Sequence, residues 1–280
     1  MPGKTRKRVH GGSMNNRKGT GSAVSPLQIA AGVARGADRI LTALVALALA
    51  AVFLFACFAL WDTWRIYEGA GTDESLLKYK PQLDKDNRES FEQLMEINPD
   101  VCAWLTIEDT NIDYPVVQGE DNVTYLNTDV YGDFSLSGSI FLDYRNARDF
   151  SDSYSLIYGH HMDGKVMFGE LSNFSGESYF NKHKTGILYL PDETYQFTIF
   201  ACLQTDAYNS LIFSPGNLPE DELDGLLDWA KENALQYREI RTSDPDRILA
   251  LSTCSDTSTN ARTVVLGYLE TLTGVKGSEG

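Results

Sequence analysis

The longest apolar run in the chain is Ile40 to Trp61, ILTALVALALAAVFLFACFALW, which contains no charged residue. A helix needs about 20 apolar residues to cross the hydrocarbon core of a bilayer, and this run has 22. The pattern therefore predicts a transmembrane anchor over residues 40–61. The polar and mixed stretch that follows, interrupted by Pro81, predicts a stalk and N-terminal helices over residues 62–98. Phe91, Leu94 and Met95 fall on one helical face there, and Asn98-Pro99 ends that helix.

Beyond residue 98 the apolar period changes from helical to strand-like. Six strands are predicted at Val101–Ile107, Ile112–Val117, Ser139–Leu142, Tyr154–Tyr158, Gly186–Leu190 and Tyr195–Leu203. Two more lie within Asp246–Leu269, where a strand ends at Cys254 and another begins at Arg262, with the polar loop Ser255–Ala261 between them. Eight short strands with turn residues between them are typical of a mainly antiparallel β-barrel, closed or nearly closed.

One further helix interrupts this series of strands. It starts with Pro219 in its first position and has three acids in its first turn. Its apolar residues share one face: Leu223, Leu226, Leu227, Ala230 and Ala234. We therefore expect a mainly β protein with peripheral helices. An eight-stranded barrel covers residues 99–270, one helix is inserted between late strands, and residues 271–280 form a flexible tail.

Charge changes sign across the apolar run. Residues 1–39 hold eight Lys or Arg and one acid, and the remaining residues are strongly acidic. Because basic residues favour the cytoplasmic side of a membrane, residues 1–39 are predicted to be a cytoplasmic tail and the barrel to be extracellular. Two alternatives are a cleaved signal peptide and a lipoprotein signal ending at Cys57. The acidic exterior makes nucleic acid an unfavourable partner.

Four cysteines are present, without a CxxC pair, and Cys57 falls in the apolar run. An odd number therefore remains outside the membrane, which does not favour a disulfide framework and does favour a free thiol. Cys102 and Cys202 lie inside apolar strands, where a cysteine packs as a small hydrophobic residue. Cys254 stands where a strand becomes a loop, so it is the candidate for a reachable, reactive thiol.

A cysteine nucleophile needs a base. Outside residues 1–39 the histidines are His160, His161 and His183. Adjacent residues of an extended chain point to opposite sides, so His160 and His161 are not expected to serve one site. His183, in the charged run NKHK, is interpreted as a solvated surface residue. The alternative of a metal site lacks ligand spacing such as HExxH, and we expect no metal and no other cofactor.

Arg262 at the start of the last strand could make only a surface ion pair. Its combination with Cys254 and with Gly159-His160 favours a functional site instead. All three lie at strand ends, and functional residues gather at barrel rims and in connecting loops. A thiol, an imidazole and a guanidinium are the groups that acyl transfer needs.

The motifs that contain these residues resemble class B sortases, membrane-anchored cysteine transpeptidases of Gram-positive bacteria. LSTC at Leu251–Cys254 resembles the TLxTC strand end of the family, with Ala250 in place of its first Thr, and Arg262 matches the family arginine. IYGHHM, followed by MFGEL, is similar to the histidine segment, and INPDVCAWLTIEDTNIDYPVVQGEDNVTYLN and SGSIFLDYRN also resemble this class.

The resemblance implies a sortase barrel in which Cys254 attacks a sorting signal, His160 transfers protons and Arg262 stabilises the oxyanion or the peptide. Asn122, Leu126, Tyr158 and Ser252 match positions that line the sorting-signal groove. The implied partners are surface proteins with a C-terminal sorting signal, the amine of peptidoglycan or of its lipid-linked precursor, and the membrane. Two other function classes stay open: a secreted cysteine peptidase or amidase that passes the acyl group to water, and a non-catalytic binding barrel.

Overall fold

The computed structural model describes residues 25–72, 74–83, 85–242, 247–254 and 260–272 of the chain. The predicted polar loop after Cys254 and most of the predicted N- and C-terminal tails therefore lie outside the described residues. Contacts divide the chain into two compact units, Met1–Ala59 and Leu60–Gly280.

The apolar run lies within helix α1, Pro26–Gly69, which is longer than the 22 residues predicted from the apolar run. Its segment Pro26–Arg65 is long and apolar enough to cross a membrane, and its most apolar window is not covered by other parts of the protein. Exposed apolar side chains along a helix of this length fit a lipid environment. A signal sequence near the N-terminus can meet the same criteria of length and composition.

Two helices precede the strands of the second unit, α2 (Glu74–Leu77) and α3 (Arg88–Ile97). Phe91 and Leu94 of α3 are completely buried, and they share a core cluster with Leu76 and with the strand residue Trp104. The spacing of Phe91 and Leu94 places both on one face of the helix. This predicted amphipathic helix is therefore confirmed.

Nine strands are formed by the described residues. They are β1 (Val101–Ile107), β2 (Asp113–Val117), β3 (Ile140–Leu142), β4 (Tyr154–Tyr158), β5 (Thr185–Tyr189), β6 (Thr194–Asp206), β7 (Gln236–Tyr237), β8 (Ile248–Cys254) and β9 (Ala261–Thr271). All eight predicted strands are present, with ends shifted by a few residues. The two-residue strand β7 was not predicted.

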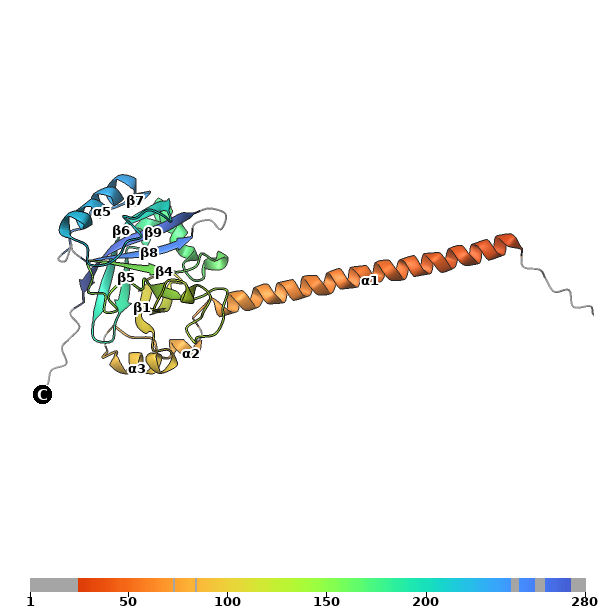
Figure 1. Cartoon of the computed structure of the whole chain (residues 1–280), viewed down its shortest axis with the longest axis horizontal. Coiled ribbons are helices and arrows are strands. Elements are labelled where there is room, and N and C mark those ends of the chain that lie inside the picture. The colour runs from red at the N-terminus through yellow and green to blue at the C-terminus, as the bar shows by residue number, and fades with distance from the viewer. Residues whose placement is uncertain (1–24, 73, 84, 243–246, 255–259, 273–280) are drawn as a thin grey trace, which may run out of the picture. The chain divides into compact units, whose positions relative to one another are not determined.

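Hydrogen bonds order the sheet as β5-β1-β2-β3-β4-β8-β9-β6-β7, and a further pairing of β5 with β6 closes it. Eight strands thus form a closed barrel, and β7 adds to the outer edge of β6 (Figure 1). The predicted barrel is confirmed. Most pairs are antiparallel, whereas β2–β3 and β4–β8 are parallel.

Helix α5, Glu220–Asn233, covers the outside of the barrel beside β6 (Figure 1). It begins one residue later than predicted, because Pro219 is its N-cap residue. Leu223, Leu226 and Ala230 are buried in one cluster with Ile248 and Ala250 of β8. The intervening β8 residues Leu249 and Leu251 belong to a different cluster, as strand alternation requires. This explains why β8 is apolar throughout.

The prediction of a single helix among the strands was wrong. A short helix, α4 (Glu177–Lys182), precedes β5, and three 3-10 turns also lie in the connections: η1 (Thr124–Leu126), η2 (Asp163–Lys165) and η3 (Gly169–Ser175). Helix α4 has only six residues, too few to give the repeated apolar spacing that identifies a helix in a sequence.

Candidate active site

Strand pairing brings the predicted residues to one end of the barrel. Strand β8 lies between β4 and β9, with Ser252 paired with Tyr158 on one side and Val264 on the other. Two residues further on, the backbone of Cys254 is paired with that of Arg262. Directly opposite residues of an antiparallel pair have Cα atoms about 5 Å apart. The backbones of Cys254 and Arg262 are therefore neighbours at the rim of the barrel.

His160 follows the end of β4, and its backbone is held on two sides. The Gly159 N–H donates to the Ser252 carbonyl at 3.1 Å, and the His160 carbonyl accepts the Phe168 N–H at 3.0 Å. A Cβ at Gly159 would lie 2.4 Å from Ile140 Cδ1 and 2.8 Å from the Phe168 ring. Glycine is required there because the chain passes close to buried side chains.

The imidazole of His160 is half-buried and points toward the segment that contains η1. Its Nε2 lies 2.7 Å from the carbonyl oxygen of Leu126. Because a carbonyl can only accept, this hydrogen bond requires a proton on Nε2. It fixes the ring and leaves Nδ1 as the nitrogen that can gain or lose a proton.

His160 and Leu126 line a cavity of about 300 Å³. The residues that line it are Asn122, Leu126, Phe141, Tyr158, Gly159, His160, Ala207, Phe213, Ser252, Thr253 and Arg262. Of the seven residues selected from the sequence, six line the cavity. The backbone of the seventh, Cys254, follows directly after Thr253 at the end of β8.

Two hydroxyl groups of this cavity have no hydrogen-bond partner among the described residues. Ser252 and Thr253 are each 1% exposed, and neither hydroxyl is paired within that part of the chain. A buried polar group without a partner costs about 1–3 kcal/mol. Such groups at the wall of a cavity indicate a site at which a ligand supplies the missing hydrogen bonds.

Arg262 is half-buried, and its Nη1 donates to the Ala261 carbonyl at 3.1 Å. Among the described residues no carboxylate forms an ion pair with it. The interpretation of Arg262 as a residue of a surface ion pair is therefore not supported. Its remaining N–H groups can stabilise a negative charge that develops in the cavity.

A buried carboxylate, Asp143, lies behind the cavity wall. Its Oδ2 accepts hydrogen bonds from Asn122 Nδ2 at 2.8 Å and from the Tyr158 hydroxyl at 3.0 Å. Arg145 makes a bidentate pair with the same carboxylate. Burial disfavours the charged form, but the hydrogen bonds from Arg145 and Asn122 outweigh it, and the pKa of Asp143 is lowered.

The comparison with protein families shows the family of the chain. A family model described as the sortase domain matches residues 105–270, which include Cys254, His160 and Arg262. The chain belongs to the sortase family.

Its relatives define the class. Sortase B of Listeria monocytogenes is 34% identical over 188 residues, which are 66% of this chain and 75% of the relative. A solved class B sortase of Streptococcus pyogenes involved in pilus biogenesis is 51% identical, with a TM-score of 0.59 over 64% of this chain and 97% of that chain. A sortase B–substrate complex of Staphylococcus aureus is 30% identical, with a TM-score of 0.62 over 66% of this chain and 86% of that chain. The chain is a class B sortase enzyme.

The other cysteines of the sortase barrel lie in its core, as predicted. Cys102 is 3% exposed and Cys202 is completely buried. Burial raises the pKa of each thiol to about 12. A thiol with such a pKa carries almost no thiolate at neutral pH, so neither is suited to be a nucleophile.

His161 and His183, the other two histidines among the described residues, do not line the cavity. His161 lies outside it, and its Nδ1 is 3.4 Å from the Ser172 hydroxyl. The interpretation of His183 as a solvated residue was wrong, because it is 4% exposed. Its Nδ1 is 3.0 Å from the Glu108 carbonyl, and its ring lies 4.1 Å from that of Tyr179. The burial of His183 could not be predicted from the charged run NKHK, because the histidine is the C-cap residue of α4 and packs inward.

Several cavity residues were not selected from the sequence. Phe141 of β3 lies beside Tyr158 of β4, with ring centroids 5.3 Å apart. The ring of Phe213 stacks on that of Tyr158, with centroids 6.5 Å apart. Ala207 and Phe213 belong to the connection from β6 to α5. The sequence of this connection gives no indication that Phe213 lies beside Tyr158 at the end of β4. The signal for Phe141 was present in the matched segment SGSIFLDYRN.

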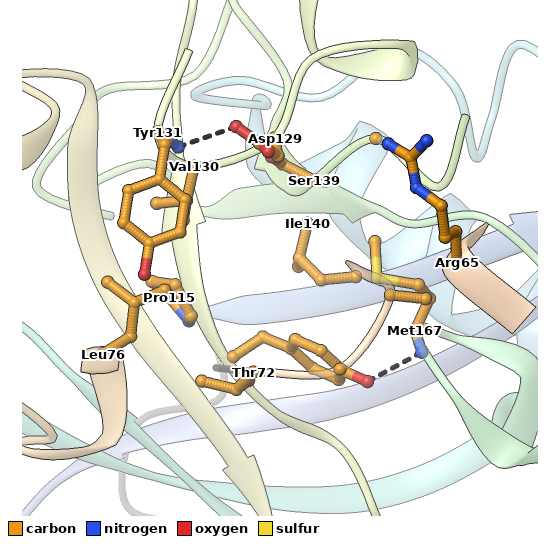
Figure 2. Close-up of a pocket in the computed structure, with 14 residues that line it drawn as sticks. Arg65, Thr72, Leu76, Pro115, Asp129, Val130, Tyr131, Ser139, Ile140 and Met167 are labelled. Atoms are coloured by element: carbon orange, nitrogen blue, oxygen red, sulfur yellow. Dashed lines mark hydrogen bonds between the residues drawn. The ribbon is translucent and has the colours of Figure 1, made fainter. Parts of the chain in front are cut away.

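A second, larger cavity of about 580 Å³ lies elsewhere in the same unit, lined by Arg65, Leu76, Asp129, Tyr131 and Ile140 among others (Figure 2). Its buried polar groups already have protein partners. The Ser139 hydroxyl donates to the Thr128 carbonyl. The Met167 N–H donates to the Tyr114 hydroxyl, and the dashed line at Met167 in Figure 2 marks this bond. The cavity that contains His160 is therefore the better candidate for a substrate site.

The described residues contain no group of three or more His, Cys, Asp or Glu that could hold a metal ion. The polar groups that line the cavity are an imidazole, a guanidinium, an amide and the hydroxyls of Tyr158, Ser252 and Thr253, and the backbone of Cys254 follows at the end of β8.

Proposed function

We propose that this class B sortase cleaves a C-terminal sorting signal of secreted proteins and joins the cleaved protein to an amine of peptidoglycan or of its lipid-linked precursor. One observation carries the proposal. A single cavity is lined by His160, by Arg262 and by two buried hydroxyls without partners, at the strand end that carries Cys254. A nucleophile, a base and an oxyanion donor that meet at one cavity are the requirements of acyl transfer through a covalent intermediate.

In the first half-reaction the Cys254 thiolate attacks the carbonyl carbon of the scissile peptide bond. The carbon–sulfur bond forms, the carbon–nitrogen bond breaks, and protonated His160 gives its proton to the leaving amine. The product is a thioester between Cys254 and the surface protein. In the second half-reaction an acceptor amine attacks the thioester, His160 takes its proton, and the thiolate leaves.

Arg262 supports both half-reactions. Each passes through a tetrahedral intermediate whose oxygen carries a negative charge, and a guanidinium at that oxygen lowers the barrier. Arg262 lines the cavity and is paired with Cys254 across the β8–β9 ladder. It has N–H groups that face no carboxylate among the described residues.

The sorting peptide would bind along the remaining wall. Leu126 supplies an apolar contact, and Asn122, Tyr158 and Ser252 supply polar groups. The buried Ser252 hydroxyl needs a partner, which a peptide backbone can provide. The Staphylococcus aureus relative with a TM-score of 0.62 has been solved as a substrate complex, which supports a peptide site in this fold.

The acceptor has a second candidate. The Streptococcus pyogenes relative involved in pilus biogenesis is 51% identical, whereas the Listeria monocytogenes sortase B is 34% identical. A pilus is built from protein chains, so its assembly uses an amine of another protein as acceptor. The same thioester at Cys254 serves either acceptor, because both attack as a neutral amine.

We further propose that the apolar segment 40–61 anchors the enzyme in the membrane, with residues 1–39 in the cytoplasm and the barrel outside. The excess of basic residues before the span and of acids after it supports this orientation. An anchor of this kind holds the barrel at the surface where exported proteins and lipid-linked precursors emerge.

The proposal is tested with the full-length protein in detergent micelles and a library of fluorescence-quenched peptides. Each cleaved peptide is then incubated with triglycine, with a lysine-containing peptide, or with water alone. A transpeptidase forms the amide product with one of the amines. Release of free acid at the same rate with and without every amine would instead identify a cysteine peptidase or amidase.

A further inference from the structure

The Asp143 carboxylate accepts more hydrogen bonds than are needed to hold the turn in which it lies. It follows β3, and its side chain is completely buried. Its Oδ1 accepts from Arg145 N at 3.0 Å and Nε at 2.8 Å, and its Oδ2 accepts from Arg145 Nη2 at 2.7 Å. Asn122 and Tyr158 add two more donors to Oδ2. A carboxylate has about four lone-pair sites, so this one is fully occupied.

The donors come from separate segments that line the cavity. Asn122 precedes η1, and Tyr158 ends β4. Arg145 extends the connection to a third segment, because its Nη2 also donates to the Phe213 carbonyl at 2.9 Å. Phe213 belongs to the connection between β6 and α5. The Asp143–Arg145 ion pair therefore connects three segments that line the proposed peptide site.

These contacts decide how the polar groups face the cavity. Asn122 Nδ2 donates to Asp143, while its Oδ1 accepts the Tyr144 N–H at 3.0 Å. The amide is thus held in one of its two orientations. The Tyr158 hydroxyl donates its hydrogen bond to Asp143, so its oxygen can only accept a hydrogen bond from a ligand. Without the carboxylate, the Tyr158 hydroxyl could rotate, and the Asn122 amide would keep only its bond from the Tyr144 N–H.

The backbone around Asp143 makes it a fixed reference point. Its N–H donates to the Leu156 carbonyl at 2.9 Å, which extends the β3–β4 pairing. Its carbonyl accepts the Gln118 side-chain N–H at 3.0 Å and the Asn146 N–H at 3.0 Å. The carboxylate therefore does not move independently of the barrel.

We propose that Asp143 is a positioning residue of the sortase. It orients Asn122 and Tyr158 for the sorting peptide and, through Arg145, sets the place of the Phe213 wall. Asp143 does not touch the reacting atoms. Its loss should weaken the binding of the peptide and leave the reactivity of the Cys254 thiol unchanged. This inference rests on the proposed function, because it assigns a role within the same site.

The test measures KM and kcat separately for the full-length protein in detergent micelles. The probe is the fluorescence-quenched peptide that the wild-type enzyme cleaves best from the library. In Asp143→Asn an NH₂ group replaces one carboxylate oxygen. It cannot accept the hydrogen bonds that Arg145, Asn122 and Tyr158 donate to the carboxylate. We expect KM to rise about tenfold, the loss of roughly one hydrogen bond, with kcat and the rate of alkylation of Cys254 by iodoacetamide within about threefold of wild type.

Asp152→Asn is the matched control. Asp152 holds the same turn, because its Oδ2 accepts from Asn146 Nδ2 at 2.8 Å and from the Ala147 N–H at 2.7 Å. Neither of these two partners lines the cavity. A purely structural effect of the turn would raise KM equally in both variants and would overturn the proposal. The proposed role predicts a wild-type KM for Asp152→Asn.

A double-mutant cycle with Tyr158→Phe tests whether Asp143 acts through Tyr158. If it does, Tyr158→Phe raises KM in the wild-type background and raises it much less in the Asp143→Asn background. Additive effects would contradict this route. A folded Asp143→Asn enzyme with unchanged KM would overturn the whole inference.

Arg145→Met keeps the proposal testable if Asp143→Asn does not fold. The Arg145 side chain is 38% exposed, so its replacement leaves no large cavity. We expect faster amide hydrogen exchange in residues 207–213 and a raised KM, and finding neither would overturn the role of Arg145. A wild-type enzyme that cleaves no peptide of the library would instead contradict the proposed function itself.

Discussion

His160 Nε2 lies 2.7 Å from the carbonyl oxygen of Leu126, so the proposed base is bonded to the same segment that lines the peptide site. The bond holds the imidazole toward the cavity in the tautomer with a proton on Nε2. A carbonyl acceptor also stabilises the imidazolium that forms when Nδ1 takes a proton. The two residues thus link the proton transfer to the wall that binds the peptide.

Replacement of His160 by alanine should lower the rate of thioester formation by about 10²–10⁴-fold, the usual contribution of a general acid or base. His161→Ala is the matched control, because His161 is the adjacent histidine and lies outside the cavity. Stopped-flow measurement of the released peptide fragment gives the rate. Equal losses in the two variants would contradict the role of His160.

The thiols should differ in reactivity by position. Cys102 and Cys202 are buried, with a pKa of about 12 for each thiol, so they should resist iodoacetamide at pH 7.5 in the folded protein. Cys254 should be alkylated under the same conditions. The measurement is mass spectrometry of a proteolytic digest, made in a Cys57→Ala background so that the apolar segment contributes no thiol. A non-catalytic barrel would show three equally slow cysteines.

Gly159→Ala should destabilise the fold by about 1–3 kcal/mol, as expected when a methyl group is forced into a packed core. The added Cβ would meet Ile140 and Phe168. Gly225→Ala is the matched control, since a Cβ at Gly225 meets nothing within 4 Å. That residue lies within α5, so the change should stabilise by about 0.5–1 kcal/mol. Urea unfolding measures both. A neutral Gly159→Ala would show that the β4 end is not tightly packed.

The pH dependence of stability should depend on Asp143. Its pKa is lowered in the folded state by the Arg145 and Asn122 hydrogen bonds, which outweigh burial. The carboxylate therefore contributes stability above the unfolded pKa, about 3.9 for Asp, and this contribution is lost as pH falls through the lower folded value. We expect wild type to lose more free energy of unfolding between pH 6 and pH 3 than Asp143→Asn does.

Urea unfolding at both pH values gives that difference. The exposed acids Asp121 and Asp149 also have lowered pKa values, but they are present in both proteins and cancel in the comparison. An equal loss of stability in the two proteins would mean that the pKa of Asp143 is not lowered by folding.

The barrel could be predicted from the sequence because its strands are short apolar runs separated by turns. β1 and β4 have the predicted bounds, and the largest errors are at the ends of β6 and β9. The parallel pairing of β4 with β8 could not be predicted from the strand patterns, since residues 158 and 252 are far apart in the chain. That pairing brings His160 to the strand end of Cys254.

The site could be predicted in part. Cys254, His160 and Arg262 stand at strand ends, which local patterns reveal. Asp143 also follows a predicted strand end, but the sequence did not show that it is buried, and Phe213 gave no such signal. A carboxylate two residues before an arginine is usually part of an exposed pair, and only the packing of β3 against β4 shows that this carboxylate is buried.

The acyl-enzyme tests the central claim most directly. Full-length protein is mixed with the best peptide of the library and quenched in acid within seconds, and the mass of the intact protein is measured. The account predicts a wild-type adduct with the mass of the N-terminal peptide fragment, removed by hydroxylamine and by an acceptor amine. Cys254→Ala should show no adduct. An adduct of normal amount in Cys254→Ala, or peptide cleavage at the wild-type rate by that variant, would contradict the account.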